Sequence, residues 1–201
     1  MESLGFEALH FPAVFVKPRP PCVGFEGLRL ASRNVWRAIL ATNTSMVVFE
    51  DDVILHAYYK QQLYPDVAND ICRHVKYAQE AGKDLVYLGY IGEGNVRWGT
   101  HAMWITPFAA KFLLANTASC YTKVKGDGVD SQVVAGCRQK NMRCWYAKPK
   151  DQKPVMGASK RHGGGFGFFI QDRVSISSYL HSGSNNAMTD QNAIKRKPVW
   201  D

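Results

Sequence analysis

Long apolar runs are missing from this sequence of 201 residues. No stretch approaches the roughly 20 apolar residues that a membrane-spanning helix needs, so we expect no membrane span. The first residues, Met1 to Glu7, also lack the basic start and apolar core of a signal peptide. Two compartments therefore stay open. We expect the cytoplasm if the chain is complete as shown, and the secretory pathway if an upstream signal is missing.

Closely spaced cysteine pairs are missing too. The five cysteines are Cys22, Cys72, Cys120, Cys137 and Cys144, with no CxxC among them. Their odd number and their mostly apolar or helical neighbours favour buried free thiols. We therefore expect neither a zinc site nor a disulfide framework.

Acidic residues are scarce relative to basic ones, with 17 Asp and Glu against 25 Lys and Arg, which gives a net charge of +8. The basic residues cluster at 148–153, 160–161 and 195–197. Such an excess favours phosphate-bearing ligands or polyanions. Because no zinc-ligand pair or aromatic RNA-binding strand accompanies the charge, we do not expect a nucleic-acid partner.

Helical patterns and short apolar runs alternate along the chain. Apolar residues recur at helical spacing over 27–41 and 67–78, and Gly82 is placed as the C-cap of the second helix. Thr106 before Pro107 begins a further helix. A fourth helix carries Val129 to Cys137, with Asp127 as its expected cap. Strands are predicted at 46–49, 84–88, 101–105 and 143–147. The alternation predicts an α/β sandwich with a mostly parallel sheet.

Two glycine-rich stretches are predicted as loops. The segment 89–99 carries four glycines, which suits a backbone that passes close to a ligand. The segment 148–167 is basic and ends in Gly-Gly-Gly-Phe-Gly, so we expect a mobile loop or lid there. Residues after His181 are polar, and we expect a disordered tail.

Three adjacent carboxylates stand inside an apolar run, Val47 to Leu55. A buried strand cannot carry Glu50, Asp51 and Asp52 through its middle without large desolvation and like-charge costs. The strand is therefore expected to end near Phe49, with the acids facing a cleft. A divalent cation that holds a phosphate-bearing ligand is the usual counter-charge for such a group. The alternative is a solvated acidic turn.

Several segments, taken together in this order, narrow the prediction. They are Ser32–Leu40, Val47–Val53, Leu85–Gly89, Thr100–Ile105, Ala109–Leu114, Val129–Asp130, Phe169–Gln171 and Ser175–Ile176. This series resembles glycosyltransferase family 25, which includes bacterial lipooligosaccharide and animal procollagen galactosyltransferases. The resemblance implies a GT-A-like (Rossmann-like) α/β/α sandwich over residues 1–181, followed by the tail at 182–201. The family's usual first strand has no counterpart here, so we expect an N-terminally short domain.

The resemblance also implies roles for individual residues. Asp52 and Glu50 would hold Mn²⁺ or Mg²⁺, which neutralises the diphosphate of a nucleotide sugar as it leaves. Glu50 and Asp51 would also face the nucleotide sugar. His101 would touch the donor sugar or its phosphate, with a structural hydrogen-bonding role as the alternative. Asp130 would deprotonate the acceptor hydroxyl, with helix capping as the alternative.

The implied activity is inverting transfer of a hexose to a hydroxyl group, with galactose as the expected hexose and UDP-galactose as its donor. A saccharide and a hydroxylated polypeptide are both open as acceptors, and the basic loop favours an acidic or phosphorylated one. Two other hypotheses compete with this activity. In the first, the chain is a catalytically degenerate glycan- or nucleotide-binding domain, or a truncated fragment of such an enzyme. In the second, the chain binds polyanions through its positive charge.

Overall fold

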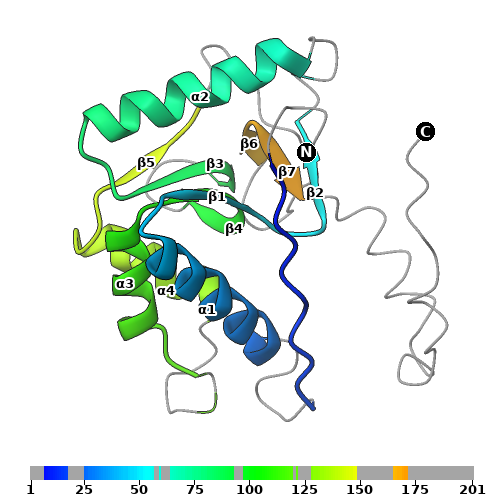
Figure 1. Cartoon of the computed structure of the whole chain (residues 1–201), viewed down its shortest axis with the longest axis vertical. Helices are drawn as coiled ribbons and strands as arrows, with labels where there is room; N and C mark the ends of the chain where they lie inside the picture. Colours follow the sequence, from blue (N-terminus) through cyan, green and yellow to red (C-terminus); the bar gives the residue numbers. More distant parts are fainter. Residues whose placement is uncertain are drawn as a thin grey trace, which may run out of the picture. The chain divides into compact units, whose positions relative to one another are not determined.

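The computed structural model describes residues 7–17, 25–56, 59, 64–92, 97–119, 121, 128–148 and 165–171. All of them belong to the first of two units into which the chain divides, Met1–Gln171. The predicted tail, most of the predicted lid and the expected cap Asp127 lie outside the described residues. The elements, drawn in Figure 1, are α1 (Phe25–Thr42), β1 (Met46–Phe49), β2 (Val53–Leu55), α2 (Tyr64–Glu80), β3 (Leu85–Ile91), β4 (Trp98–Ile105), α3 (Pro107–Asn116), α4 (Val129–Arg138), β5 (Cys144–Tyr146), β6 (Gly165–Gly167) and β7 (Phe169–Gln171).

Local signals place the helices where the sequence predicts them. The Thr106 side chain accepts a hydrogen bond from the Ala109 amide, and Pro107 is the first residue of α3, so the predicted cap is confirmed. Gly82 follows α2 with a φ of 62°, a left-handed conformation that glycine adopts at little cost. The next amide, of Lys83, donates to the Ala78 carbonyl and closes the end of the helix.

The central sheet is mixed, in the order β1-β4-β3-β5, with β6 also paired to β3. The prediction of a mostly parallel sheet is wrong: β4 pairs antiparallel with β1 and with β3, β6 pairs antiparallel with β3, and only β3 and β5 are parallel. The reason is the length of the connections. Parallel neighbours need a crossover of a dozen or more residues, and the segment 92–97 between β3 and β4 is too short for one. Helices α3 and α4 supply such a crossover between β3 and β5.

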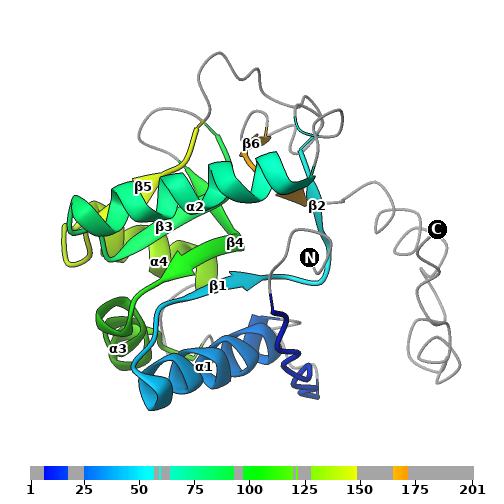
Figure 2. The ribbon, with the colours of Figure 1, turned by 45° about the horizontal axis from the view of Figure 1, so that its top comes forward.

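Helices cover both faces of this sheet (Figures 1 and 2). On one face, side chains from α1, α3 and α4 pack with Tyr87, Met103 and Ile105 of the sheet. On the other face, α2 packs on Val86 and Trp104, together with the aromatic side chains before and in β7. The described part is thus a mixed α/β sandwich.

A second, two-stranded sheet is formed by β2 and β7, which are antiparallel. It is joined to the first sheet by main-chain hydrogen bonds of Phe168, whose amide donates to the Leu88 carbonyl and whose carbonyl accepts from the His56 amide. The segment 148–167, predicted as a loop, therefore ends in an ordered strand, β6.

A disulfide joins the last turn of α4 to the first residue of β5. Cys137 and Cys144 are bonded at an S–S distance of 2.03 Å, with their Cα atoms 5.6 Å apart. Cys72 is a free thiol and is exposed, so the prediction of buried free thiols is wrong for these three residues. Sequence spacing hid the pair, because the turn at 139–143 is what brings the two thiols together.

Candidate functional site

The three adjacent acids form the turn between β1 and β2. Strand β1 ends at Phe49, as predicted, and the Glu50 amide still donates to the His101 carbonyl of β4, at 2.9 Å. The Val53 amide donates to the Glu50 carbonyl at 3.4 Å, which closes the turn. Glu50 is half-buried and Asp51 is exposed. The acids thus stand at the end of an edge strand of the central sheet.

One hydroxyl brings two of the predicted site residues together. The Thr100 Oγ1 atom lies 2.7 Å from Glu50 Oε1 and 2.5 Å from Asp130 Oδ1. Glu50 follows β1, Thr100 is in β4, and Asp130 is in the first turn of α4. We call Glu50 and Asp130 the acid pair, and Thr100 its bridge. Only 5% of the Thr100 surface is exposed, so solvent screens these contacts weakly.

The direction of the Thr100 side chain comes from an irregularity in β4. The pairing of β3 with β4 shifts register between Tyr87 and Gly89 and again between Gly89 and Ile91. Such irregularities re-aim side chains. Thr100 contacts Asp130 of α4, whereas the ring of its neighbour His101 lies against β7, with Nε2 3.3 Å from the Phe169 carbonyl oxygen.

The bridge has a chemical consequence. A threonine hydroxyl carries one proton, so it donates to only one of two carboxylates at a time. The second short contact is favourable only if a further proton is shared among the three groups. Asp130 is in the first turn of α4, where the helix dipole favours a negatively charged side chain. The acid pair is therefore a place that takes up positive charge.

Glu50 of the acid pair and its bridge Thr100 line a groove of about 1060 Å³. Its walls come from the segment 7–17, from α1 and from β1, and its lining includes Glu50, Asp51, Thr100 and Val129. The side chains of the N-terminal wall are exposed: 65% of the Leu9 surface and 89% of the Phe15 surface are open to solvent. A groove of this size is at the upper end of the volumes that hold small-molecule ligands.

Three predicted residues, Asp130, Asp52 and His101, are not part of the groove lining. Asp52 is half-buried in the same turn as Glu50 and has a buried Oδ1 atom. His101 is fully buried, and its ring fits against Gly89 and Gly99 as well as the Phe169 carbonyl. This geometry matches the structural alternative for His101, and contact with a donor stays a prediction.

Within the residues that the structure describes, no group of three or more His, Cys, Asp or Glu side chains is arranged to hold a metal ion. Mg²⁺ is, however, commonly bound through one or two carboxylates plus substrate phosphates. The carboxylate oxygens of Glu50 and Asp52, which belong to one turn, are donors of the hard type that Mg²⁺ and Mn²⁺ prefer. The residues present therefore fit a cation that arrives with a phosphate ligand.

Tyr87 stands next to the acid pair, and its importance is not visible in the sequence. Burial raises the pKa of the Tyr87 hydroxyl well above its usual value, and the nearby Tyr146 and Asp130 raise it further. The hydroxyl is thus neutral at ordinary pH. Thr100 was missed as well, because only the register of β4 turns it toward Asp130.

Neither a scan against protein-family models nor a comparison with curated proteins gives a match for this chain. In the described part of the chain, no helix has both the length and the apolar character needed to cross a membrane. Function is therefore proposed from the residues of the site together with the resemblance described above.

Proposed function

We propose that this protein is a glycosyltransferase that moves a hexose, galactose in the first instance, from a UDP-sugar to a hydroxyl acceptor. One observation carries the proposal: Glu50 and Asp130, distant in sequence, meet at Thr100 beside a groove of about 1060 Å³. The resemblance to glycosyltransferase family 25 supplies the reaction class. It assigns the carboxylate after the strand to the donor and the carboxylate at the helix start to the acceptor.

In this mechanism Asp130 accepts the proton of the acceptor hydroxyl. The acceptor oxygen then bonds to the anomeric carbon as the bond from that carbon to UDP breaks, and UDP departs with the electron pair, so configuration inverts. Thr100 holds Glu50 and Asp130 in fixed relative positions, because its hydroxyl contacts both. Glu50, with Asp52 from the same turn, would hold a divalent cation, which supplies neutralisation of the diphosphate charge.

The test is release of UDP from UDP-galactose by the full chain in the presence of Mn²⁺, with and without saccharide acceptors. We expect Asp130→Asn to slow release by roughly a hundredfold or more, because positioned acid–base groups contribute about 10²–10⁴ in rate. Asn keeps an oxygen that accepts from Thr100, so the fold should survive. Glu50→Gln should lower the affinity for Mn²⁺ in the same assay.

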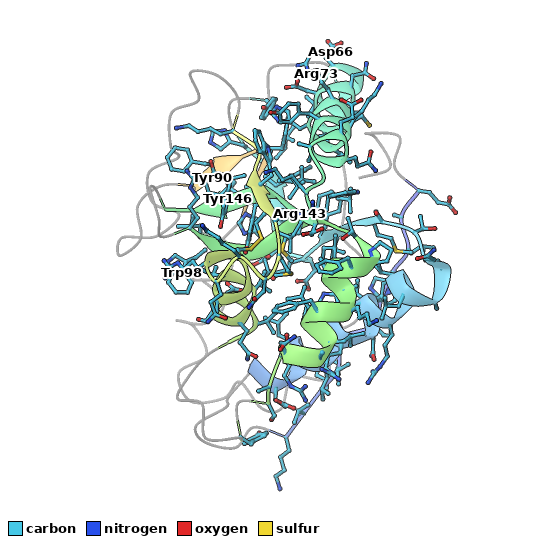
Figure 3. The ribbon with its side chains drawn as sticks, turned by 90° about the vertical axis from the view of Figure 1, so that its left-hand side faces the viewer. Asp66, Arg73, Tyr90, Trp98, Arg143 and Tyr146 are labelled. Atoms are coloured by element: carbon cyan, nitrogen blue, oxygen red, sulfur yellow. A yellow bond between two sulfur atoms is a disulfide. The ribbon has the colours of Figure 1, made fainter. Side chains whose placement is uncertain are left out.

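Asp66→Asn is the matched control, because Asp66, labelled in Figure 3, is an exposed carboxylate on α2, which carries none of the predicted site residues. Its rate should equal that of the wild type. A wild-type chain that binds UDP-galactose with Mn²⁺ but releases no UDP would favour the degenerate binding domain. A chain that shows neither binding nor release would refute the proposal.

A further inference from the structure

Four aromatic rings meet where β5 and β6 pair with β3. The Tyr87 and Tyr146 rings stack with centroids 4.6 Å apart and planes only 4° apart. Tyr90 meets Tyr146 edge-on at 5.3 Å and stacks on Phe166 at 5.6 Å. The sheet register produces this arrangement, because Tyr87 is opposite Tyr146 and Tyr90 is opposite Phe166. We call these four residues the aromatic cluster; Figure 3 labels Tyr90 and Tyr146, which lie near one another.

Cationic side chains lie over this cluster and beside it. The Arg97 guanidinium carbon is 4.4 Å from the Tyr146 ring centroid and 5.6 Å from that of Tyr90. Lys148 Nζ is 4.7 Å from the Phe166 ring centroid. These separations are within the range of cation–π attraction, so the rings hold the cations in place.

A second guanidinium, that of Arg138, lies over a neighbouring ring. The Arg138 guanidinium carbon is 5.8 Å from the Trp98 ring centroid. Burial raises the pKa of the Tyr146 hydroxyl, whereas the charges of Arg97 and Arg138 act in the opposite direction. Both guanidinium groups are therefore close enough to act on one phenol group. Two cations that act on one phenol group favour the approach of an anion.

The charge of Arg97 is not neutralised by any carboxylate in the described part of the chain. Ion pairs there are made by Arg29, Arg73 and Arg143, and neither Arg97 nor Lys148 takes part in one. The Arg97 Nε atom is buried without a hydrogen-bond partner there. A buried donor without a partner is costly, more so on a charged group, so a ligand that accepts this hydrogen bond gains affinity.

The cations stand a short way from the acid pair. Tyr87 belongs to the aromatic cluster, because its ring stacks on that of Tyr146, and the charge of Asp130 reaches the Tyr87 hydroxyl and helps to raise its pKa. A ligand with an anionic group and a free hydroxyl would be attracted by the cations and repelled by the acids. The two charges together would thus fix its orientation, with the hydroxyl toward Asp130.

We propose that Arg97, Arg138 and Lys148 on the aromatic cluster bind the anionic group, a phosphate or a carboxylate, of a sugar. A guanidinium fork matches both groups through two parallel hydrogen bonds. In the reaction proposed above this sugar is the acceptor, and that assignment rests on the proposed function. The binding site itself does not.

The experiment measures binding to the full chain by calorimetry in low salt without any nucleotide, using glucose 6-phosphate, glucuronate, glucose and inorganic phosphate. We expect one or both anionic sugars to bind more tightly than glucose and inorganic phosphate. Comparison of the affinities for glucose 6-phosphate and glucuronate shows whether the site binds a phosphate or a carboxylate group. Binding should weaken as salt rises, because exposed charges are screened.

Arg97→Gln should weaken binding of the better sugar by roughly tenfold or more, since hydrogen bonds between charged groups contribute about 1.5–3 kcal/mol. Lys148→Gln, at an exposed position, is a second variant that does not depend on the packing of Arg97. Arg37→Gln is the matched control, because Arg37 is exposed on α1, where its guanidinium donates a hydrogen bond to Asn34 Oδ1.

Equal binding of glucose and the anionic sugars would overturn this proposal, and so would unchanged binding by both Arg97→Gln and Lys148→Gln. Inorganic phosphate that binds as tightly as glucose 6-phosphate would overturn the sugar part. None of these results depends on UDP release. Failure of the transferase assay and failure of this site are therefore distinguishable.

Discussion

Gly89 lies in β3 directly against the backbone of β7, and its replacement by alanine tests that close approach. A Cβ atom at this position would lie 2.6 Å from His101 Nε2 and 2.9 Å from the Phe169 carbonyl carbon, and closer still to the carbonyl oxygen. An ordinary contact of a Cβ atom is 3.4–4 Å. The backbone of β7 or the His101 ring must therefore move by close to an ångström.

The cost follows from what can move. Phe169 pairs with Leu55 in β2, and His101 is fully buried, so neither neighbour can rotate away. Overpacking of this kind costs about 1–3 kcal/mol, and we expect the upper half of that range. For a chain of this length 1 kcal/mol shifts Tm by about 2–4 °C, so Gly89→Ala should lower Tm by about 4–12 °C.

Gly136→Ala is the matched control in the same assay, thermal unfolding followed by circular dichroism. Its Cβ would meet the Met142 and Phe112 side chains at 2.8 Å each, and flexible side-chain ends of this kind can shift. Alanine also favours the interior of α4 by up to about 1 kcal/mol. We expect a Tm within a few degrees of the wild type. A Gly89→Ala variant as stable as the wild type, or a Gly136→Ala variant equally destabilised, would refute this reasoning.

Two further predictions concern stability. Reduction of the Cys137–Cys144 disulfide, whose cysteines are seven residues apart, should lower the free energy of unfolding by about 2–3 kcal/mol, because the unfolded chain gains entropy when the loop opens. Urea unfolding with and without dithiothreitol measures this change, and equal midpoints would contradict the prediction. His74 is half-buried, with its ring edge-on to Phe168, and burial lowers its pKa, with Arg73 adding to the effect and Asp70 opposing it. The unfolded chain therefore binds the proton first as pH falls through about 6.5, and stability is lost below that pH. His74→Gln should show a smaller loss between neutral pH and about pH 5 in urea titrations, and an unchanged pH dependence would count against this cause.

Short-range signals allowed several elements to be predicted. The cap Thr106, the following Pro107 and the left-handed Gly82 act within one turn of their helices, so the sequence contains all the information that they need. The end of β1 before Glu50 was predictable for a similar reason, because adjacent carboxylates cannot continue a buried strand.

Strand direction and the bridge of the acid pair depend on partners that are distant in sequence. The short connection between β3 and β4 was visible, and counting its residues would have excluded a crossover helix. The direction of the Thr100 side chain was not visible, because it follows from register shifts against β3. The disulfide and the convergence of Arg97 with Arg138 likewise depend on the three-dimensional arrangement.

The pairing of β3 on both edges also has a consequence for the order of folding. Its antiparallel neighbour β4 follows after a short connection, whereas β5 and β6 come only after α3 and α4. Local pairings close at a smaller entropic cost, so we expect the β3–β4 hairpin to form before the other edge of β3 is covered. During synthesis the chain would then expose Tyr87 and Tyr90 until residues 144–167 have emerged. The aromatic cluster is thus expected to be among the last parts of the sheet to gain protection from hydrogen exchange.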